Sequence, residues 1–245
     1  MNLDLIELLE NLFAIGGNHQ QNRLIKLKEE FLDYLRDNAM DLFVNPNNHI
    51  LARDSVLFID AVNMRATTND RQKAYSIAKP ILDRFAVLKE WNFYEIKLFI
   101  GLCSYTSHFQ EALAHTIHAN LQLAKFKREP RYMHTLAILH YNLMGRLLEA
   151  KYFDKLPDDE QKVLKNVFSR FMGESLLLCE SKPYFKQVLL LRNALFEQDA
   201  LAINKACSKL VGLVSDETTL DMILNDVNFY VDSDEYKSLK LKGVQ

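Results

Sequence analysis

Three histidines are the residues of this sequence whose types and spacing come nearest to a metal site. His115 and His118 are three positions apart on an expected helix, and His108 lies two turns before His115. Two helical turns separate residues by about 10 Å, which is too far for one ion to bind both. The spacing therefore favours histidines that face solvent, and we expect neither a metal nor another cofactor.

The other patterns that mark catalytic sites are missing from the sequence. It contains no glycine-rich phosphate loop, no nucleophile elbow and no H-E-x-x-H pair. The acidic pairs Glu7 with Glu10 and Glu29 with Glu30 are typical of solvated helix faces, and Cys103 lies in an apolar stretch typical of a core. Because no nucleophile–base pair is evident, we expect that the chain is not an enzyme.

A more informative pattern lies on the helix expected over residues 131–149. Leucines and Tyr132 line one face, whereas the other face presents His134, Asn142, Gly145 and Arg146 around Ile138. An asparagine offers a donor and an acceptor to a peptide bond, and an arginine can pair with a carboxylate. This face suits contact with an extended peptide, although an ordinary outer face explains it equally well.

Asparagine and arginine recur together on later helices. This recurrence suggests that several helices contribute to one peptide-binding groove. A groove formed by stacked repeats requires such recurrence at the repeat spacing. The candidate peptide-binding residues are Tyr94, Lys97, Tyr105, His134, Asn142, Arg146, Asn166, Arg170, Arg192 and Asn193.

The elements that must position these residues are predicted to be helices throughout. The 245 residues include only 7 glycines and 5 prolines, and no segment alternates apolar and polar residues as a strand does. Apolar residues instead recur at helical spacing between short polar connections. The expected helices cover about residues 3–14, 22–38, 50–66, 71–88, 91–100, 108–127, 131–152, 157–172 or 157–179, 183–197, 199–214 and 218–227.

Three details of these helices lead to specific expectations. Asn45–Asn48 contains a proline between asparagines and predicts a turn. Pro80 lies inside the fourth helix and is expected to kink or split it near Lys79. The helix from Trp91 to Ile100 is apolar on nearly all sides, which predicts a position at the centre of the domain.

Pairs of these helices recur roughly every 35 to 45 residues, the scale of helical-hairpin repeats. We therefore expect an all-α fold of tetratricopeptide-like hairpins stacked into a right-handed superhelix with a concave face, although the consensus residues of that repeat are not in register. Residues 1–230 are expected to form a single repeat domain, and residues 231–245 a C-terminal tail.

Charge and hydropathy narrow the class of partner. The formal net charge is −2, so no basic field favours nucleic acid or an anionic membrane. The apolar runs are too short to span a bilayer, and the acidic N-terminus does not match a signal peptide. Three widely spaced cysteines fit reduced thiols, so a cytoplasmic location without membrane contact is expected.

The stretch Leu88-Lys89-Glu90-Trp91-Asn92-Phe93-Tyr94-Glu95-Ile96-Lys97-Leu98-Phe99 resembles the Rgg/GadR/MutR family of Gram-positive transcriptional regulators. The resemblance extends from about Leu3 to about Tyr230, and its most specific residues are Trp91, Tyr94, Glu95, Leu98 and Phe99. Many members of that family have an asparagine after Leu-Phe, where this chain has Ile100 and Gly101.

The resemblance implies a regulatory domain that binds a short signalling peptide in its concave face, forms a homodimer and takes part in quorum sensing. It implies DNA binding only through a helix-turn-helix domain that this chain lacks. Apolar residues near the C-terminus, Met222, Ile223, Leu224, Phe229 and Tyr230, also favour a homodimer. The alternative hypothesis is a stand-alone helical-repeat adaptor that binds a protein partner without touching DNA.

Overall fold

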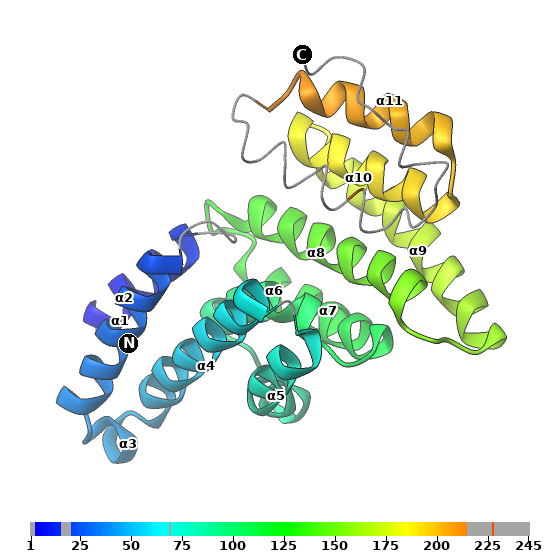
Figure 1. Ribbon diagram of the computed structural model, residues 1–245. Helices are drawn as coiled ribbons and strands as arrows, with labels where there is room; N and C mark the ends of the chain where they lie inside the picture. The colour runs from blue at the N-terminus through cyan, green and yellow to red at the C-terminus, as the bar shows by residue number, and fades with distance from the viewer. Residues whose placement is uncertain (1–2, 16–20, 69, 215–226, 228–245) are drawn as a thin grey trace. The chain divides into compact units, whose positions relative to one another are not determined.

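The computed structural model describes residues 3–15, 21–68, 70–214 and 227 (Figure 1). These residues form eleven α-helices and two short 3₁₀ helices, and none of them lies in a strand, which confirms the predicted all-α class. The α-helices are α1 Leu3–Ile15, α2 Gln21–Asp37, α3 Asp41–Val44, α4 Pro46–Thr68, α5 Arg71–Val87, α6 Phe93–Leu102, α7 Phe109–Leu123, α8 Tyr132–Phe153, α9 Asp158–Leu178, α10 Pro183–Glu197 and α11 Ala200–Val211; the 3₁₀ helices are η1 Cys103–Tyr105 and η2 Ala124–Phe126.

Most predicted helices are confirmed to within a few residues at each end. The helix over residues 183–197 begins and ends as predicted, because Pro183 suits a first turn and Gln198 leaves the helix in a left-handed conformation with φ 57°. The expected helix over residues 218–227, the tail and the apolar residues predicted to support a dimer lie outside the described residues, apart from the helical Val227.

The predicted turn at Asn45–Asn48 is wrong. Helix α4 begins at Pro46, and the short helix α3 precedes it. A proline costs nothing at the first helical position, where its missing N–H would have no helical acceptor, so the same residue that suggested a turn starts a helix.

The predicted split at Pro80 is also wrong. Helix α5 runs without interruption from Arg71 to Val87. Pro80 is exposed, whereas Ala78, Ile81 and Leu82 are buried on the side of α5 that packs in the core. The buried side holds the helix together, and the proline only removes one backbone hydrogen bond from its exposed side.

Helix α6 has the central position that its apolar sequence predicts. Ile96, Leu98, Phe99 and Leu102 are all fully buried. Asn92 caps the helix: its side chain accepts from the N–H of Glu95, and the Glu95 carboxylate accepts from the N–H of Asn92. This capping box starts α6 two residues later than the sequence pattern suggested.

Gly101 lets α6 approach α4 closely, and a methyl group at this position should destabilise the protein. A Cβ atom there would lie 2.5 Å from Cε2 of Phe58. We expect Gly101→Ala to lower the free energy of unfolding by about 1–3 kcal/mol, the usual cost of overpacking.

Gly173→Ala is the matched control for this substitution. Gly173 lies inside helix α9 with nothing within 4 Å of the added Cβ. Alanine should stabilise the helix there by about 0.5–1 kcal/mol. Urea unfolding followed by circular dichroism checks both values, and a destabilised Gly173→Ala together with an unaffected Gly101→Ala would contradict the packing argument.

The chain divides into two compact units, one up to Tyr132 and one from Met133. In the first unit, α2 and α5 both pack extensively against α4, and α6 packs against α7. In the second unit, α10 packs against α9 and α11. Adjacent helices therefore pair within each unit. The single repeat domain expected over residues 1–230 stays a prediction, because a stack of hairpins can itself divide into two units.

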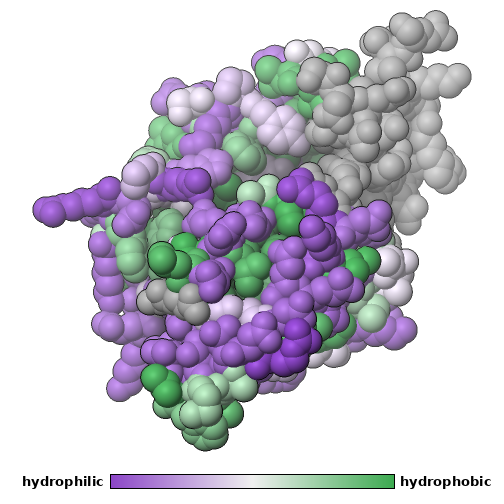
Figure 2. All heavy atoms as spheres, turned by 90° about the vertical axis from the view of Figure 1, so that its left-hand side faces the viewer, coloured by the Kyte–Doolittle hydropathy of each residue, from purple (hydrophilic) through white to green (hydrophobic). Residues whose placement is uncertain are grey.

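Several exposed apolar side chains lie together at α3, on the surface of the first unit. Met40, Leu42, Phe43 and Val44 are between 49% and 77% exposed, and an apolar cluster projects at the lower edge of Figure 2, where α3 lies.

Over the described part of the chain, no helix combines the length and the apolar character needed to cross a membrane.

Candidate peptide-binding groove

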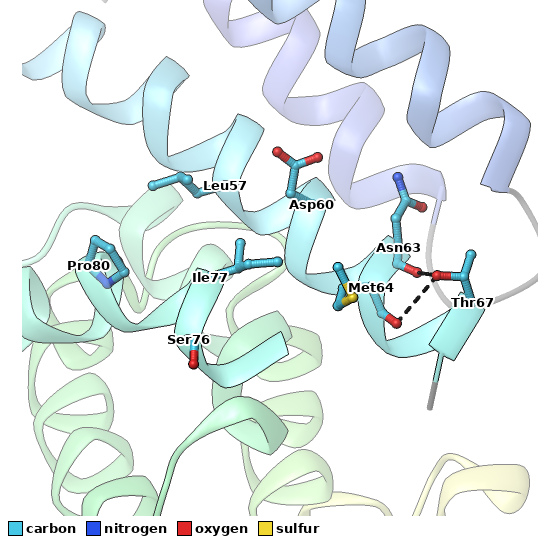
Figure 3. Close-up of a pocket in the computed structure, with 8 residues that line it drawn as sticks. All are labelled: Leu57, Asp60, Asn63, Met64, Thr67, Ser76, Ile77 and Pro80. Atoms are coloured by element: carbon cyan, nitrogen blue, oxygen red, sulfur yellow. Dashed lines mark hydrogen bonds between the residues drawn. The ribbon is translucent and has the colours of Figure 1, made fainter. Parts of the chain in front are cut away.

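A groove of about 480 Å³ lies between helices α4 and α5 (Figure 3). Leu57, Met64, Ile77 and Pro80 give it apolar walls. The polar residues that complete its lining are Asp60, Asn63, Thr67 and Ser76. The α4 members recur every three or four positions and so form one stripe along that helix.

Few of the polar groups in this groove are open to a ligand, because its hydroxyl groups bond to their own helices. The Thr67 hydroxyl donates to the carbonyl of Asn63 at 2.8 Å, and the Ser76 hydroxyl donates to the carbonyl of Gln72 at 2.9 Å. The Oδ1 atom of Asn63 is buried and has no hydrogen-bond partner among the described residues. An unpaired buried acceptor costs free energy until a donor reaches it.

Pro80 leaves a backbone acceptor on Ser76, another residue of the lining. A proline has no N–H, so the carbonyl of Ser76, four residues earlier in α5, lacks its usual helical donor. Asp60 is an acceptor as well, but Lys28 of α2 already pairs with it at 2.7 Å. The groove therefore offers acceptors beside apolar walls, and this chemistry fits a ligand with N–H donors and apolar side chains, such as a peptide.

The sequence predicted other residues as the peptide site, and the structure does not bring those residues together in this groove. In the first unit, Tyr94 and Lys97 lie on α6 beside α1, and Tyr105 is buried in η1. The Nζ atom of Lys97 is 3.0 Å from the Glu10 carboxylate and lies over the rings of Phe13 and Tyr94. The interpretation of Glu10 as part of a merely solvated face is therefore wrong.

In the second unit, part of the predicted set lies along the contact between α8 and α10. The Arg192 guanidinium lies 4.0 Å from the centre of the Tyr141 ring and donates to the Tyr141 carbonyl at 2.5 Å. Gly145 permits this approach, since a Cβ there would be 3.1 Å from Nη2 of Arg192. His134 packs edge-on to Phe185, while Asn142 and Asn193 are half-buried on the same two helices.

The remaining predicted residues lie in two different environments. Arg146 is fully buried and donates to Asp154 at 2.7 Å, so the expectation that it lines an open helix face is wrong. Asn166 and Arg170 are exposed on α9, where Arg170 lies 3.6 Å from Glu174 of the same helix. As peptide contacts, all ten residues stay predictions.

The expectation of solvent-facing histidines is wrong for His115. It is 7% exposed, and its ring packs against Trp91 and Phe99. His108 instead caps α7 through a bond from the N–H of Gln110. Within residues 3–15, 21–68, 70–214 and 227, no three potential ligands lie close enough together to hold a metal ion.

All three cysteines are buried, and none of them is in a disulfide. Burial raises the pKa of Cys179 and of Cys207, although the charge of Lys182 opposes this effect at Cys179. A raised pKa disfavours the reactive thiolate, so these side chains suit packing rather than covalent chemistry.

Burial of His115 predicts a loss of stability in acid. Burial lowers the pKa of His115, Glu111 opposes this shift and His118 adds to it. The unfolded chain then binds a proton more tightly than the native state does. The free energy of unfolding should therefore fall as the pH drops through about 6.5, the pKa of an unperturbed histidine.

The measurement is urea unfolding followed by circular dichroism at pH 7.5 and pH 5.5. His115→Gln should reduce the difference between the two values, whereas His134→Gln, at an exposed position, should leave it unchanged. Equal differences in the wild type and in His115→Gln would contradict the assignment of the pH effect to His115.

Comparisons with known proteins identify no relative of this chain. No family model matches the chain, and no curated protein or solved structure matches it either.

Proposed function

We propose that this chain is the peptide-sensing regulatory part of an Rgg-like transcriptional regulator. In this proposal its helical hairpins stack as a tetratricopeptide-like superhelix, it binds a short peptide, and it forms a homodimer whose arrangement responds to that peptide. The resemblance around Trp91, Tyr94 and Glu95 supports the family, and the pairing of adjacent helices supports the repeat.

The groove between α4 and α5 is the observation that carries the proposal. Its walls are apolar and its lining residues carry acceptors, among them the buried and unpaired Oδ1 atom of Asn63. A peptide in extended form supplies backbone N–H groups to such acceptors and side chains to the apolar wall. The proposed function is binding, and it requires no catalytic residue.

Fluorescence anisotropy with labelled synthetic peptides, short and rich in apolar residues, tests this function. We expect saturable binding that Asn63→Ala weakens roughly threefold to tenfold, which corresponds to the net value of one hydrogen bond. Asn166→Ala is the matched control on an exposed surface and should leave the affinity unchanged. No saturable binding, or equal losses in both variants, would refute the groove as the peptide site.

A further inference from the structure

The ammonium group of Lys97 lies between α1 and α6, where a carboxylate and three aromatic rings surround it. Its side chain is 10% exposed, and its Nζ atom lies 4.9, 5.1 and 5.6 Å from the ring centres of Phe13, Phe93 and Tyr94. Aromatic faces attract a cation through their quadrupoles. The rings therefore fix the position of this positive charge even without a carboxylate beside it.

Glu10 places its carboxylate between Lys97 and a second cation. One oxygen is 3.0 Å from Nζ of Lys97, and the other is 2.7 Å from Nη1 of Arg131. Burial raises the pKa of Glu10, but the hydrogen bonds and charges of Lys97 and Arg131 outweigh it and hold that pKa below its usual value. Glu129 adds a further negative charge near Tyr94 of the same cluster, but Glu10 is the carboxylate that contacts both cations, so an anion that takes its place meets the same two partners.

Only the carboxylate end of Glu10 needs to move for this point to become accessible. The Glu10 side chain is 37% exposed and Arg131 is 66% exposed, whereas α1 is anchored by the buried Leu5, Leu9 and Leu12. A change of rotamer therefore removes the carboxylate without detaching the helix. The Lys97 ammonium stays between its rings while this happens.

We propose that Lys97 and Arg131 form a carboxylate-binding site that Glu10 occupies from within the chain, and that the carboxylate of a bound ligand replaces it. The exchange substitutes one anion for another, so it leaves no cation unpaired. The terminal carboxylate of a short peptide has the required charge and geometry. In naming that group the inference rests on the proposed peptide function.

Calorimetric titration with the tripeptide N-acetyl-Leu-Leu-Leu tests this site, with the free acid and the C-terminal amide as paired probes. Glu10→Gln removes the internal competitor and keeps its shape. We expect this variant to bind the free acid about tenfold more tightly than the wild type does. The amide should show no such gain, and adding Lys97→Met to the Glu10→Gln variant should abolish the gain. Competition by acetate alone, with equal affinity per carboxylate, would show that small carboxylates rather than peptides are the ligand and would overturn the peptide assignment.

Further measurements distinguish the site at Lys97 and Arg131 from the groove between α4 and α5. Adding Asn63→Ala to Glu10→Gln should leave the ratio of acid to amide affinity unchanged, even if the groove binds no peptide. Should Glu10→Gln fail to fold, the wild type gives an independent test, because the ¹³C resonance of the Glu10 carboxyl should shift when the free acid binds. The same affinity for acid and amide in Glu10→Gln, or an unmoved Glu10 resonance at saturation, would overturn the proposal.

Discussion

Asp54→Ala should lower the free energy of unfolding by about 3–5 kcal/mol, the typical cost of stranding a buried charge. Asp54 on α4 is fully buried, and its carboxylate accepts from Nε of Arg84 at 2.8 Å. Arg84 on α5 also donates to Glu95 of α6 at 2.6 Å. One guanidinium thus connects three helices of the first unit, and Asp54 is the most deeply buried of its partners.

The expected cost is large because Arg84 has little access to water. Its side chain is 16% exposed, and its Nη2 atom is buried without a hydrogen-bond partner among the described residues. Without Asp54, the guanidinium would retain Glu95 as its carboxylate partner, and that residue must also cap α6. Part of a buried positive charge would then have no negative partner. Such an uncompensated charge costs more free energy of folding than the intact ion pair contributes.

Arg53→Ala is the matched control, since Arg53 is the other arginine on the same carboxylate. Arg53 is 50% exposed and lies 3.0 Å from Asp54, so its loss should cost less than about 1 kcal/mol. Trp91 is the one tryptophan of the chain and packs on Phe85 in the first unit, so its fluorescence during urea unfolding reports on this unit. Similar costs for Asp54→Ala and Arg53→Ala would show that burial does not control the network.

Features that depend on local sequence could be predicted. Helical spacing predicted the extent of α10, and the stretch from Trp91 to Ile100, apolar on nearly all sides, predicted the central position of α6. These features depend on residues within one or two turns of each other. The turn wrongly predicted at Asn45–Asn48 depends instead on whether Pro46 ends one element or starts the next, and its local sequence fits both.

Features that depend on contacts between helices could not be predicted. Glu95 lies on a helix that is apolar on nearly all sides, and its sequence neighbours do not indicate that it pairs with Arg84, eleven residues away, and completes a capping box. The groove was missed for the same reason. Pro80 suggested only a kink or a break in its helix, whereas the acceptor that it leaves at Ser76 matters because α4 places Asn63 in the same lining.

Arg146 shows most clearly why the predicted site was incomplete. Its helix face contains histidine, asparagine and glycine, and such a composition suggested a surface for a ligand. The structure buries the side chain fully and pairs it with Asp154, which lies just after the end of α8. An ion pair eight residues apart is outside the usual helical spacings of three and four, so the pattern did not indicate it.

Asp154→Ala should lower the free energy of unfolding by about 3 kcal/mol, because it removes a carboxylate that is itself only 13% exposed from a fully buried guanidinium. The double variant Arg146→Met, Asp154→Ala replaces the pair with apolar side chains of suitable volume. Replacing a buried pair as a whole is often neutral, so the double variant should recover most of the stability that the single variant loses.

Urea unfolding followed by circular dichroism measures both changes, and the double-mutant comparison isolates the contribution of the pair. If Arg146 is structural, the double variant should also keep the peptide affinity of the wild type in the anisotropy titration, because a fully buried side chain presents no surface to a ligand. A stable double variant that no longer binds peptide would instead place Arg146 in the binding site and restore the role that its sequence suggested. A double variant less stable than Asp154→Ala alone would show that the Arg146 side chain contributes packing that methionine cannot replace.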